Sequence, residues 1–123
     1  MTVRELIEAY NDAWNRQDLD TIASMHADGI VFENHTAGER VEGADAVRAH
    51  IGRIFESWPT LRFTTQALRA GDDFAVCEWT ARAEKDGETL EWDGVDVFPL
   101  AGGKIARKDV YSSSHAPRRT TAG

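Results

Sequence analysis

The segment LEWDGVDVFPLAGGKIARKDVY, residues Leu90 to Tyr111, decides the fold because its pattern predicts two strands joined at Gly102-Gly103. A diglycine pair supplies the positive φ angles of a two-residue hairpin turn. Alternation places Asp96 on an otherwise apolar face of the first strand. With the diglycine as the loop, opposed residue numbers sum to 205. Asp96 then lies directly opposite Asp109 on the same face, with Cβ atoms about 5 Å apart.

Two ionised carboxylates at that distance are costly on an apolar face. Such a pair either shares a proton or holds a cation between its members. Arg107 faces the same way in this register, so the protein can supply the cation itself. The alternative is a bulged turn, which slips the register by one residue and sends Asp109 to solvent. The facing pair is favoured because Ile105 and Tyr111 then also lie on the inner face.

The composition is that of one soluble globular domain of 123 residues, 41% hydrophobic and 28% charged. Its net charge of −7 argues against a nucleic-acid or anionic-membrane partner, since both need clustered Lys and Arg. The sequence has no apolar run of about 18 residues and no signal-peptide core, so a cytoplasmic location is expected. We expect one domain over residues 1–112 and a disordered polar tail over 113–123.

Three helices are predicted before the long strands. A capping box from Thr2 to Glu5 begins the first, which runs to about Asn15. The second follows the cap Asp18 and stops at Asp28-Gly29.

The third helix begins after Gly43 and ends at Pro59, because the residue before proline avoids helical angles. Short strands are expected at 30–35 and 40–42, and long ones at 61–70, 73–84, 88–100 and 104–112. Pro99 fits a strand if its missing N–H faces away from a partner or marks a bulge.

The turn at Asp86-Gly87 provides an independent test of the direction of Asp96. Opposed residues across this turn sum to 173, so Cys77 faces Asp96 and Trp79 faces Gly94. The shared face is almost wholly apolar and rich in small residues, and Gly94 leaves space beside Asp96. This pattern predicts a hollow rather than a filled core.

Three helices followed by a curved meander of strands describe a cone. The chain resembles the nuclear transport factor 2-like superfamily, and especially its SnoaL-like branch. The matching segments are YNDAWNRQDLDTIASMHADGIVFENH, RVEGADAVRAHI and GVDVFPLAGGKIARKDVY. The resemblance implies an α+β, cone-shaped barrel in which the helices pack on a strongly curved, mostly antiparallel sheet enclosing a cavity. It implies function less specifically, because this superfamily mixes enzymes with non-catalytic binding and assembly domains.

The resemblance suggests roles for four residues. Asp96 matches a cavity aspartate of ketosteroid isomerases and limonene-epoxide hydrolases. Asp109 matches the late-strand acid/base aspartate of SnoaL-like polyketide cyclases, which is the water-activating base in the epoxide hydrolases. Asn34 matches an asparagine that helps to hold that water. Tyr10 matches a tyrosine of the first helix in the isomerases, where the phenol serves an oxyanion.

The sequence also departs from these relatives. The proton-shuttling aspartate of the isomerases falls at Asn34. The bridging arginine of the epoxide hydrolases falls at Gly94, and their water-holding tyrosine falls at Phe32. From the register, Arg107 is a candidate to replace that arginine.

The predicted catalytic residues are therefore Asp96, Asp109 and Asn34. The residues expected to line the cavity are Tyr10, Trp14, Phe32, Phe55, Cys77, Trp79, Trp92, Phe98, Arg107 and Tyr111. Histidines with metal-ligand spacing are absent, so we expect no metal and no cofactor. His26 is expected on a helix, and His35 at the other face of the sheet or in a dimer contact.

Each site residue also has a purely structural interpretation. Asp96 could be a polar plug in the core, bonded to a side chain of the first helix. Asp109 could lie at the rim, paired with Arg107 or Lys108, and Asn34 could stabilise the turn at the strand end. Tyr10 and Trp14 fit core packing first.

Two functional hypotheses follow. The first is a small enzyme that acts on an apolar, oxygenated molecule by acid/base chemistry, as an isomerase, hydrolase, dehydratase or cyclase. The second is a non-catalytic ligand-binding or dimerisation domain with a vestigial cavity. Both predict a homodimer through the exposed sheet face, where Val76, Val95 and Val97 form an apolar strip.

Overall fold

Three helices precede most of the sheet in the computed structural model, which describes residues 1–113 and 118–120. They are α1 (Val3–Asn15), α2 (Leu19–Ser24) and α3 (Ala44–Ser57). The capping box is confirmed: the Thr2 hydroxyl accepts from the Glu5 N–H at 3.1 Å, and the Glu5 carboxylate accepts from the Thr2 N–H at 2.9 Å. Asp18 caps α2, as predicted.

The sheet is curved and mixed, and its strands occur in the order β2-β1-β6-β5-β4-β3. The strands are β1 (His26–Asn34), β2 (Glu39–Glu42), β3 (Arg62–Ala70), β4 (Phe74–Lys85), β5 (Glu88–Ala101) and β6 (Lys104–Ser112). Neighbouring strands run antiparallel, except that β1 and β6 are parallel. The expected α+β cone is thus confirmed, with a sheet whose edge strands β2 and β3 are not paired to each other in the described residues.

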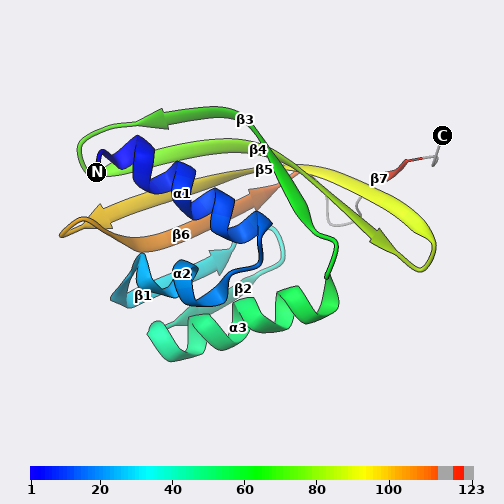
Figure 1. Cartoon of the computed structure of the whole chain (residues 1–123), viewed down its shortest axis with the longest axis horizontal. Coiled ribbons are helices and arrows are strands. Elements are labelled where there is room, and N and C mark those ends of the chain that lie inside the picture. The colour runs from blue at the N-terminus through cyan, green and yellow to red at the C-terminus, as the bar shows by residue number, and fades with distance from the viewer. Residues whose placement is uncertain (114–117, 121–123) are drawn as a thin grey trace.

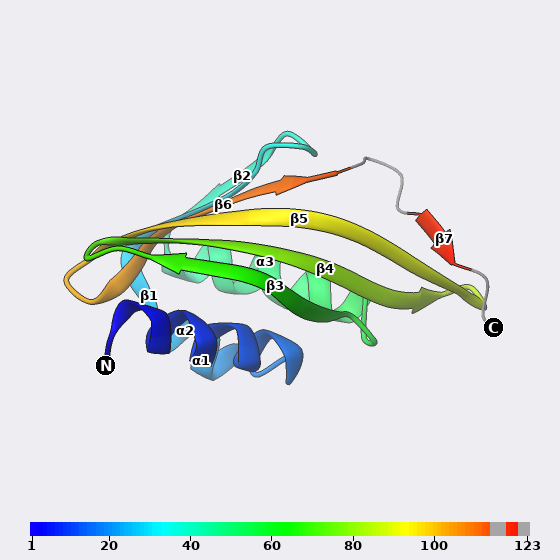
Figure 2. The same ribbon diagram turned by 90° about the horizontal axis from the view of Figure 1, so that it is seen from above.

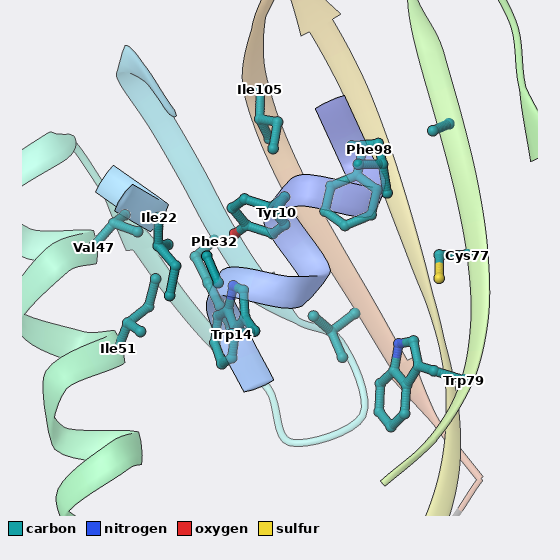
Figure 3. Packing of buried hydrophobic residues seen from close by; sticks show 14 of the residues in the cluster. Tyr10, Trp14, Ile22, Phe32, Val47, Ile51, Cys77, Trp79, Phe98 and Ile105 are labelled. Carbon is teal, nitrogen blue, oxygen red and sulfur yellow. The ribbon is translucent and has the colours of Figure 1, made fainter. Parts of the chain in front are cut away.

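The helices lie on the concave side of the sheet (Figures 1 and 2), and we call the covered side the inner face. Fully buried side chains from α1, α2 and α3 pack there against the strands, among them Ile7, Tyr10, Ile22, Val47 and Ile51. Figure 3 shows Tyr10 and Trp14 of α1 beside Phe32, with Phe98 and Cys77 on the facing strands. Apolar burial on this face stabilises the helices against the sheet.

The hairpin β4–β5 has the predicted register along its whole length, including Cys77 opposite Asp96. Its turn residues Asp86 and Gly87 have φ angles of 54° and 78°, which suit a two-residue turn with left-handed backbone at both positions. Asp96 is therefore on the inner face, as predicted.

The hairpin β5–β6 differs from the prediction. Ala101 pairs with Lys104, but further along Asp96 pairs with Val110 and Val97 with Asp109. Between these two paired stretches, three residues of β6 lie opposite two residues of β5. The extra residue forms a bulge beside Pro99. The predicted pairing of Asp96 with Asp109 is therefore wrong, and the slipped register that sends Asp109 to the other face is the one observed.

The cause of the slip is the missing N–H of Pro99. The Leu100 N–H bonds to the Asp73 carbonyl on the β4 side, so alternation directs position 99 towards β6. Proline has no donor to give there, and a bulge removes the need for one. A bulge at Pro99 is one of the expectations from the sequence, but the change of face that it causes at Asp109 is not.

The segment after α2 also differs from its prediction. Helix α2 ends at Ser24, and β1 begins at His26, so Asp28-Gly29 lies inside the strand. The pairing of β1 with β6 shifts register between His26 and Val31, which accommodates the Asp-Gly pair as an irregularity within the strand. His26 is consequently a buried strand residue and not a helix residue.

The C-terminal segment contributes a short strand, β7 (Arg118–Thr120), which pairs antiparallel with β5. A disordered tail is expected from residue 113, and the pairing of residues 118–120 with β5 departs from that expectation. Residues 114–117 and 121–123 lie outside the described residues. Within the described part of the chain, the helices are all too short or too polar to cross a bilayer.

Candidate functional site

Asp96 of β5 and Lys108 of β6 meet on the inner face. The bulge beside Pro99 turns Lys108 inward, where alternation from the turn would have directed it outward. Lys108 Nζ lies 3.8 Å from Asp96 Oδ2, and each residue is 5% exposed. At this separation two buried groups form an ion pair or share the proton as a neutral pair. The inner face therefore carries a carboxyl group and an amine that hold an exchangeable proton between them.

Aromatic rings surround the Lys108 amine. Its Nζ lies 3.7 Å from the centroid of the Trp14 ring, 5.1 Å from Tyr10 and 5.5 Å from Phe32. A cation over a ring face gains about 0.5–2 kcal/mol from the ring quadrupole. Rings from α1 and β1 thus compensate part of the hydration that Lys108 loses on burial.

Burial shifts the pKa values of both members of the pair toward their neutral forms. It raises the pKa of Asp96, and the nearby Lys108 opposes this in part. It lowers the pKa of Lys108, and the Asp96 carboxylate opposes this in part. Burial also raises the pKa of the neighbouring Cys77 thiol, so the thiol stays protonated at neutral pH. One proton transfer therefore separates the ion pair from a carboxylic acid beside a free amine.

The pair borders a cavity of about 260 Å³. All four tryptophans of the chain line it: Trp14, Trp58, Trp79 and Trp92. Its other walls are mostly apolar with a few polar groups, and they comprise Phe32, Asn34, Glu39, His50, Ile54, Leu61, Phe63, Val110 and Ser112. An apolar pocket with few polar groups is typical of a small-molecule site.

Three buried polar atoms of residues beside this cavity make no hydrogen bond of regular geometry within the described chain: Trp14 Nε1, Trp79 Nε1 and Asp96 Oδ1. Burial raises the pKa of Asp96 and of Tyr10, but Trp79 lies close enough to Asp96, and Trp14 close enough to Tyr10, to oppose this rise in part. The three residues are between 4% and 6% exposed, and an unpaired buried polar group costs about 1–3 kcal/mol. All three residues border the cavity.

Gly94 does not leave open space beside Asp96, contrary to the sequence analysis. The Trp79 indole lies against the Gly94 backbone, so closely that an added Cβ would overlap Cη2 and Cζ2 of the ring. Gly94 thus sets the position of Trp79 in the cavity wall.

We expect Gly94→Ala to destabilise the protein by about 1–3 kcal/mol, because the added methyl forces the Trp79 ring out of its place. The measurement is urea unfolding followed by circular dichroism, together with the tryptophan emission spectrum of the native state. Gly52→Ala is a matched control, since a Cβ there meets Leu19 Cδ2 at an ordinary 3.6 Å. Equal stability of the two variants would contradict the proposed role of Gly94.

Asp109 lies on the outer face, bound by Arg107 and His35. Arg107 donates to both of its oxygens, at 2.8 and 3.2 Å, and His35 Nε2 lies 2.8 Å from Oδ1. The hydrogen bond from Arg107 is the main cause that lowers the pKa of Asp109. A carboxylate held ionised and paired in this way is a weak base, and it does not border the cavity.

The same cluster contains three possible metal ligands. Oxygen or nitrogen atoms of Glu33, His35 and Asp109 all lie within 4.8 Å of one another. Arg107 bonds to both Glu33 and Asp109, so its guanidinium already supplies a cation there. The sequence does not predict that these three residues lie together, because only the parallel pairing of β1 with β6 brings them close.

Tyr10 is held in the core by His26. The Tyr10 hydroxyl lies 2.9 Å from His26 Nε2, and both residues are buried. Burial lowers the pKa of His26 to about 4, so its ring is neutral at pH 7. Burial also raises the pKa of Tyr10. Among the described residues that border the cavity, neither of these two occurs.

The other predicted site residues divide between the cavity, the core and the outer face. Those that border the 260 Å³ cavity are Asn34, Trp14, Phe32, Trp79, Trp92 and Asp96. Cys77 borders a smaller space on the other side of the pair, whereas Phe55 and Phe98 pack in the core. The prediction that Arg107 and Tyr111 line the cavity is wrong, because both lie on the outer face with Asp109. Tyr111 stacks there on His35 with ring centroids 4.4 Å apart.

Lys108 is a site residue that the sequence pattern does not predict. Period-two alternation from the diglycine turn directs it outward, and lysine is seldom buried. Proline inside a long strand was the available signal, because it marks the bulge that inverts the alternation.

A curved sheet covered by three helices, with a cavity and a polar pair on the inner face, defines the class of cone-shaped α+β proteins. The family model described as SnoaL-like domain matches residues 7–108. The chain therefore belongs to the SnoaL-like family. A search of curated proteins finds no match for it.

Solved structures share this fold at low sequence identity. An LEH-like epoxide hydrolase of M. tuberculosis is 19% identical, with a TM-score of 0.78 over 89% of this chain and 80% of its own. A Jannaschia sp. CCS1 protein described as a SnoaL-like polyketide cyclase is 21% identical, with a TM-score of 0.80 over 89% and 83%. A hypothetical protein of Catenulispora acidiphila with a ketosteroid isomerase-like fold, in complex with trimethylamine, is 15% identical, with a TM-score of 0.79 over 90% and 86%. At these identities the similarity shows the fold alone.

Proposed function

We propose that this chain is a cofactor-independent acid/base enzyme that acts on an apolar, oxygenated small molecule bound in the cavity. The observation that carries the proposal is the Asp96–Lys108 pair, which is buried and borders the cavity. Perturbed titratable groups inside an apolar pocket are typical of catalytic sites. The names of structural neighbours, an epoxide hydrolase and a polyketide cyclase among them, refer to reactions of this general kind in those proteins.

Asp96 would move the proton in this proposal. As a carboxylic acid it donates to a substrate oxygen that gains charge, and as a carboxylate it accepts a proton, while Lys108 carries the complementary proton. Asp109 has no part, because it is tied to Arg107 on the outer face.

Asn34 would orient the reacting oxygen or a water molecule, as the family resemblance implies. It borders the cavity, and its Oδ1 accepts the Ala37 N–H at 3.1 Å. This hydrogen bond fixes the side chain at the end of β1. The Asn34 amide therefore stabilises the turn at the strand end and also forms part of the cavity wall.

The second candidate is a ligand-binding domain without catalysis, in which Asp96 and Lys108 only neutralise each other. Their 3.8 Å separation favours this candidate as a permanent ion pair. A screen of epoxides, ketosteroids and polyaromatic ketones distinguishes the two candidates. Binding is followed by tryptophan fluorescence, since every tryptophan borders the cavity, and conversion by chromatography. Saturable binding without conversion of any compound would support the binding domain and contradict the enzyme.

A further inference from the structure

We propose that the Lys108 amine forms an imine with an aldehyde or ketone in the cavity, which makes carbonyl compounds the substrate class of this site. The inference rests on the proposed function insofar as both use the same cavity and the same pair. It goes further because it gives Lys108 a covalent role that electrostatic pairing with Asp96 does not require.

Lys108 meets the geometric needs of a nucleophilic amine. It borders the cavity, and its side chain is only 7% exposed, so little bulk water reaches it. Trp14 covers one side of Nζ at 3.7 Å from the ring centroid. The titratable groups that face it from the packed elements are Asp96, Tyr10, Cys77 and His26. Of these, Asp96 supplies the counter-charge.

The free-amine form is accessible in this environment. In water an ordinary lysine amine is unprotonated in only about one molecule in a few thousand at pH 7. Burial lowers the pKa of Lys108 and raises that of Asp96, so transfer of one proton between them yields the amine and the carboxylic acid together. Lysines desolvated in apolar pockets are the ones that act as covalent nucleophiles.

The chemistry balances with these two groups alone. The Lys108 nitrogen attacks the carbonyl carbon, and the carbonyl oxygen takes up the amine proton to give a carbinolamine. Asp96 then donates its proton to the hydroxyl, the C–O bond breaks, and water leaves. The products are a protonated imine on Lys108, a carboxylate on Asp96 and one water molecule. The ion pair is thereby restored, with the iminium in place of the ammonium.

The cavity suits this adduct. Its walls are mostly aromatic and apolar, which favours an aryl or other apolar substituent on the carbonyl compound.

The sequence provides internal controls, because its other lysines are Lys85 and Lys104. Both are exposed: Lys85 Nζ lies 4.0 Å from the Trp58 ring centroid, and Lys104 Nζ donates to the Ser24 carbonyl at 2.6 Å. Neither has a buried carboxylate as its partner.

The experiment is reductive trapping of the full chain with benzaldehyde and sodium cyanoborohydride at pH 7. Intact mass counts the benzyl groups, and peptide mapping assigns them to Lys85, Lys104, Lys108 or the terminal amine. We expect Lys108 to be labelled at least about tenfold faster than either other lysine, because burial favours its free-amine form and the cavity holds the aldehyde beside it. The labelling should saturate with benzaldehyde and quench tryptophan emission.

Lys108→Arg keeps the charge but cannot form an imine, so it should lose both the label at this position and its saturable phase. Labelling of Lys108 no faster than Lys104 in the unmodified chain would overturn the imine. Conversion that depends on Asp96 without any trapping would leave the acid/base enzyme standing and remove the imine. Trapping of Lys108 without conversion of any compound would support the imine and contradict the acid/base enzyme.

Discussion

Asp96→Asn is expected to lower kcat/KM for any converted compound by about 10²–10⁴-fold, the usual contribution of a general acid or base. Asp109→Asn is expected to change it by less than about fivefold, because a partly exposed ion pair contributes at most about 1 kcal/mol. Both substitutions keep the shape of the side chain and remove its charge. The contrast therefore isolates the inner acid from the outer one.

The pH dependence of kcat/KM adds a second readout. Activity that needs the Asp96–Lys108 pair should follow two apparent pKa values that belong to the coupled pair, and Lys108→Arg should move them. Native circular dichroism of each variant controls for folding. A large loss with Asp109→Asn, or full activity in Asp96→Asn, would contradict the assignment.

The sequence patterns that fixed the fold were local ones. Capping at Thr2 and Asp18, the break at Pro59 and the two-residue turns each act within a few residues, and each is present in the structure. The turn at Asp86-Gly87 also determines a register over twelve residue pairs without a shift. Asp96 could be placed inside for this reason.

The candidate site was less predictable, because one extra residue in β6 reverses the face of the sheet to which every later side chain of that strand points. The bulge beside Pro99 exchanges Asp109 for Lys108 on the inner face. Alternation alone cannot locate such a bulge, and the preference of lysine for solvent argued against burying Lys108. The exchange is explained by the hydrogen bond from the Leu100 N–H towards β4, because it directs position 99, where proline has no N–H, towards β6.

Non-local pairing accounts for the remaining differences. His26 is buried because β1 begins next to β6, with His26 opposite Ile105. His35 reaches Asp109 for the same reason, since the parallel pairing of β1 and β6 is not encoded by any turn between them. His35 thus lies on the other face of the sheet, as expected, and the dimer contact predicted for that face stays a prediction.

The two single-residue variants of the pair are expected to lose stability with opposite pH dependence. In Lys108→Met, Asp96 is buried without its cation, and its folded pKa lies above the unfolded value of about 3.9. The folded state then binds more protons than the unfolded state. The stability of this variant relative to the parent is therefore greatest near pH 4 and falls as the pH rises toward 8.

In Asp96→Asn the sign is reversed. Lys108 is buried without its anion, and its folded pKa lies below the unfolded value of about 10.4. The unfolded state binds more protons, so the stability of this variant relative to the parent is lowest at acid and neutral pH and recovers toward pH 10. Each single substitution should cost about 3–5 kcal/mol where the remaining group is charged.

Urea unfolding of both variants and the parent between pH 4 and 10, compared at each pH, measures these slopes. The double variant Asp96→Leu/Lys108→Met removes both charges, and it should lie near the parent with neither slope, since an apolar pair of similar size replaces a buried ion pair at little cost. Asp109→Asn is the outer-face control and should cost about 1 kcal/mol or less. Losses that are equal at every pH would mean that the side chains act through packing alone. In that case the inner face would hold no exchangeable proton, and both the acid/base role of Asp96 and the free amine of Lys108 would have to be given up.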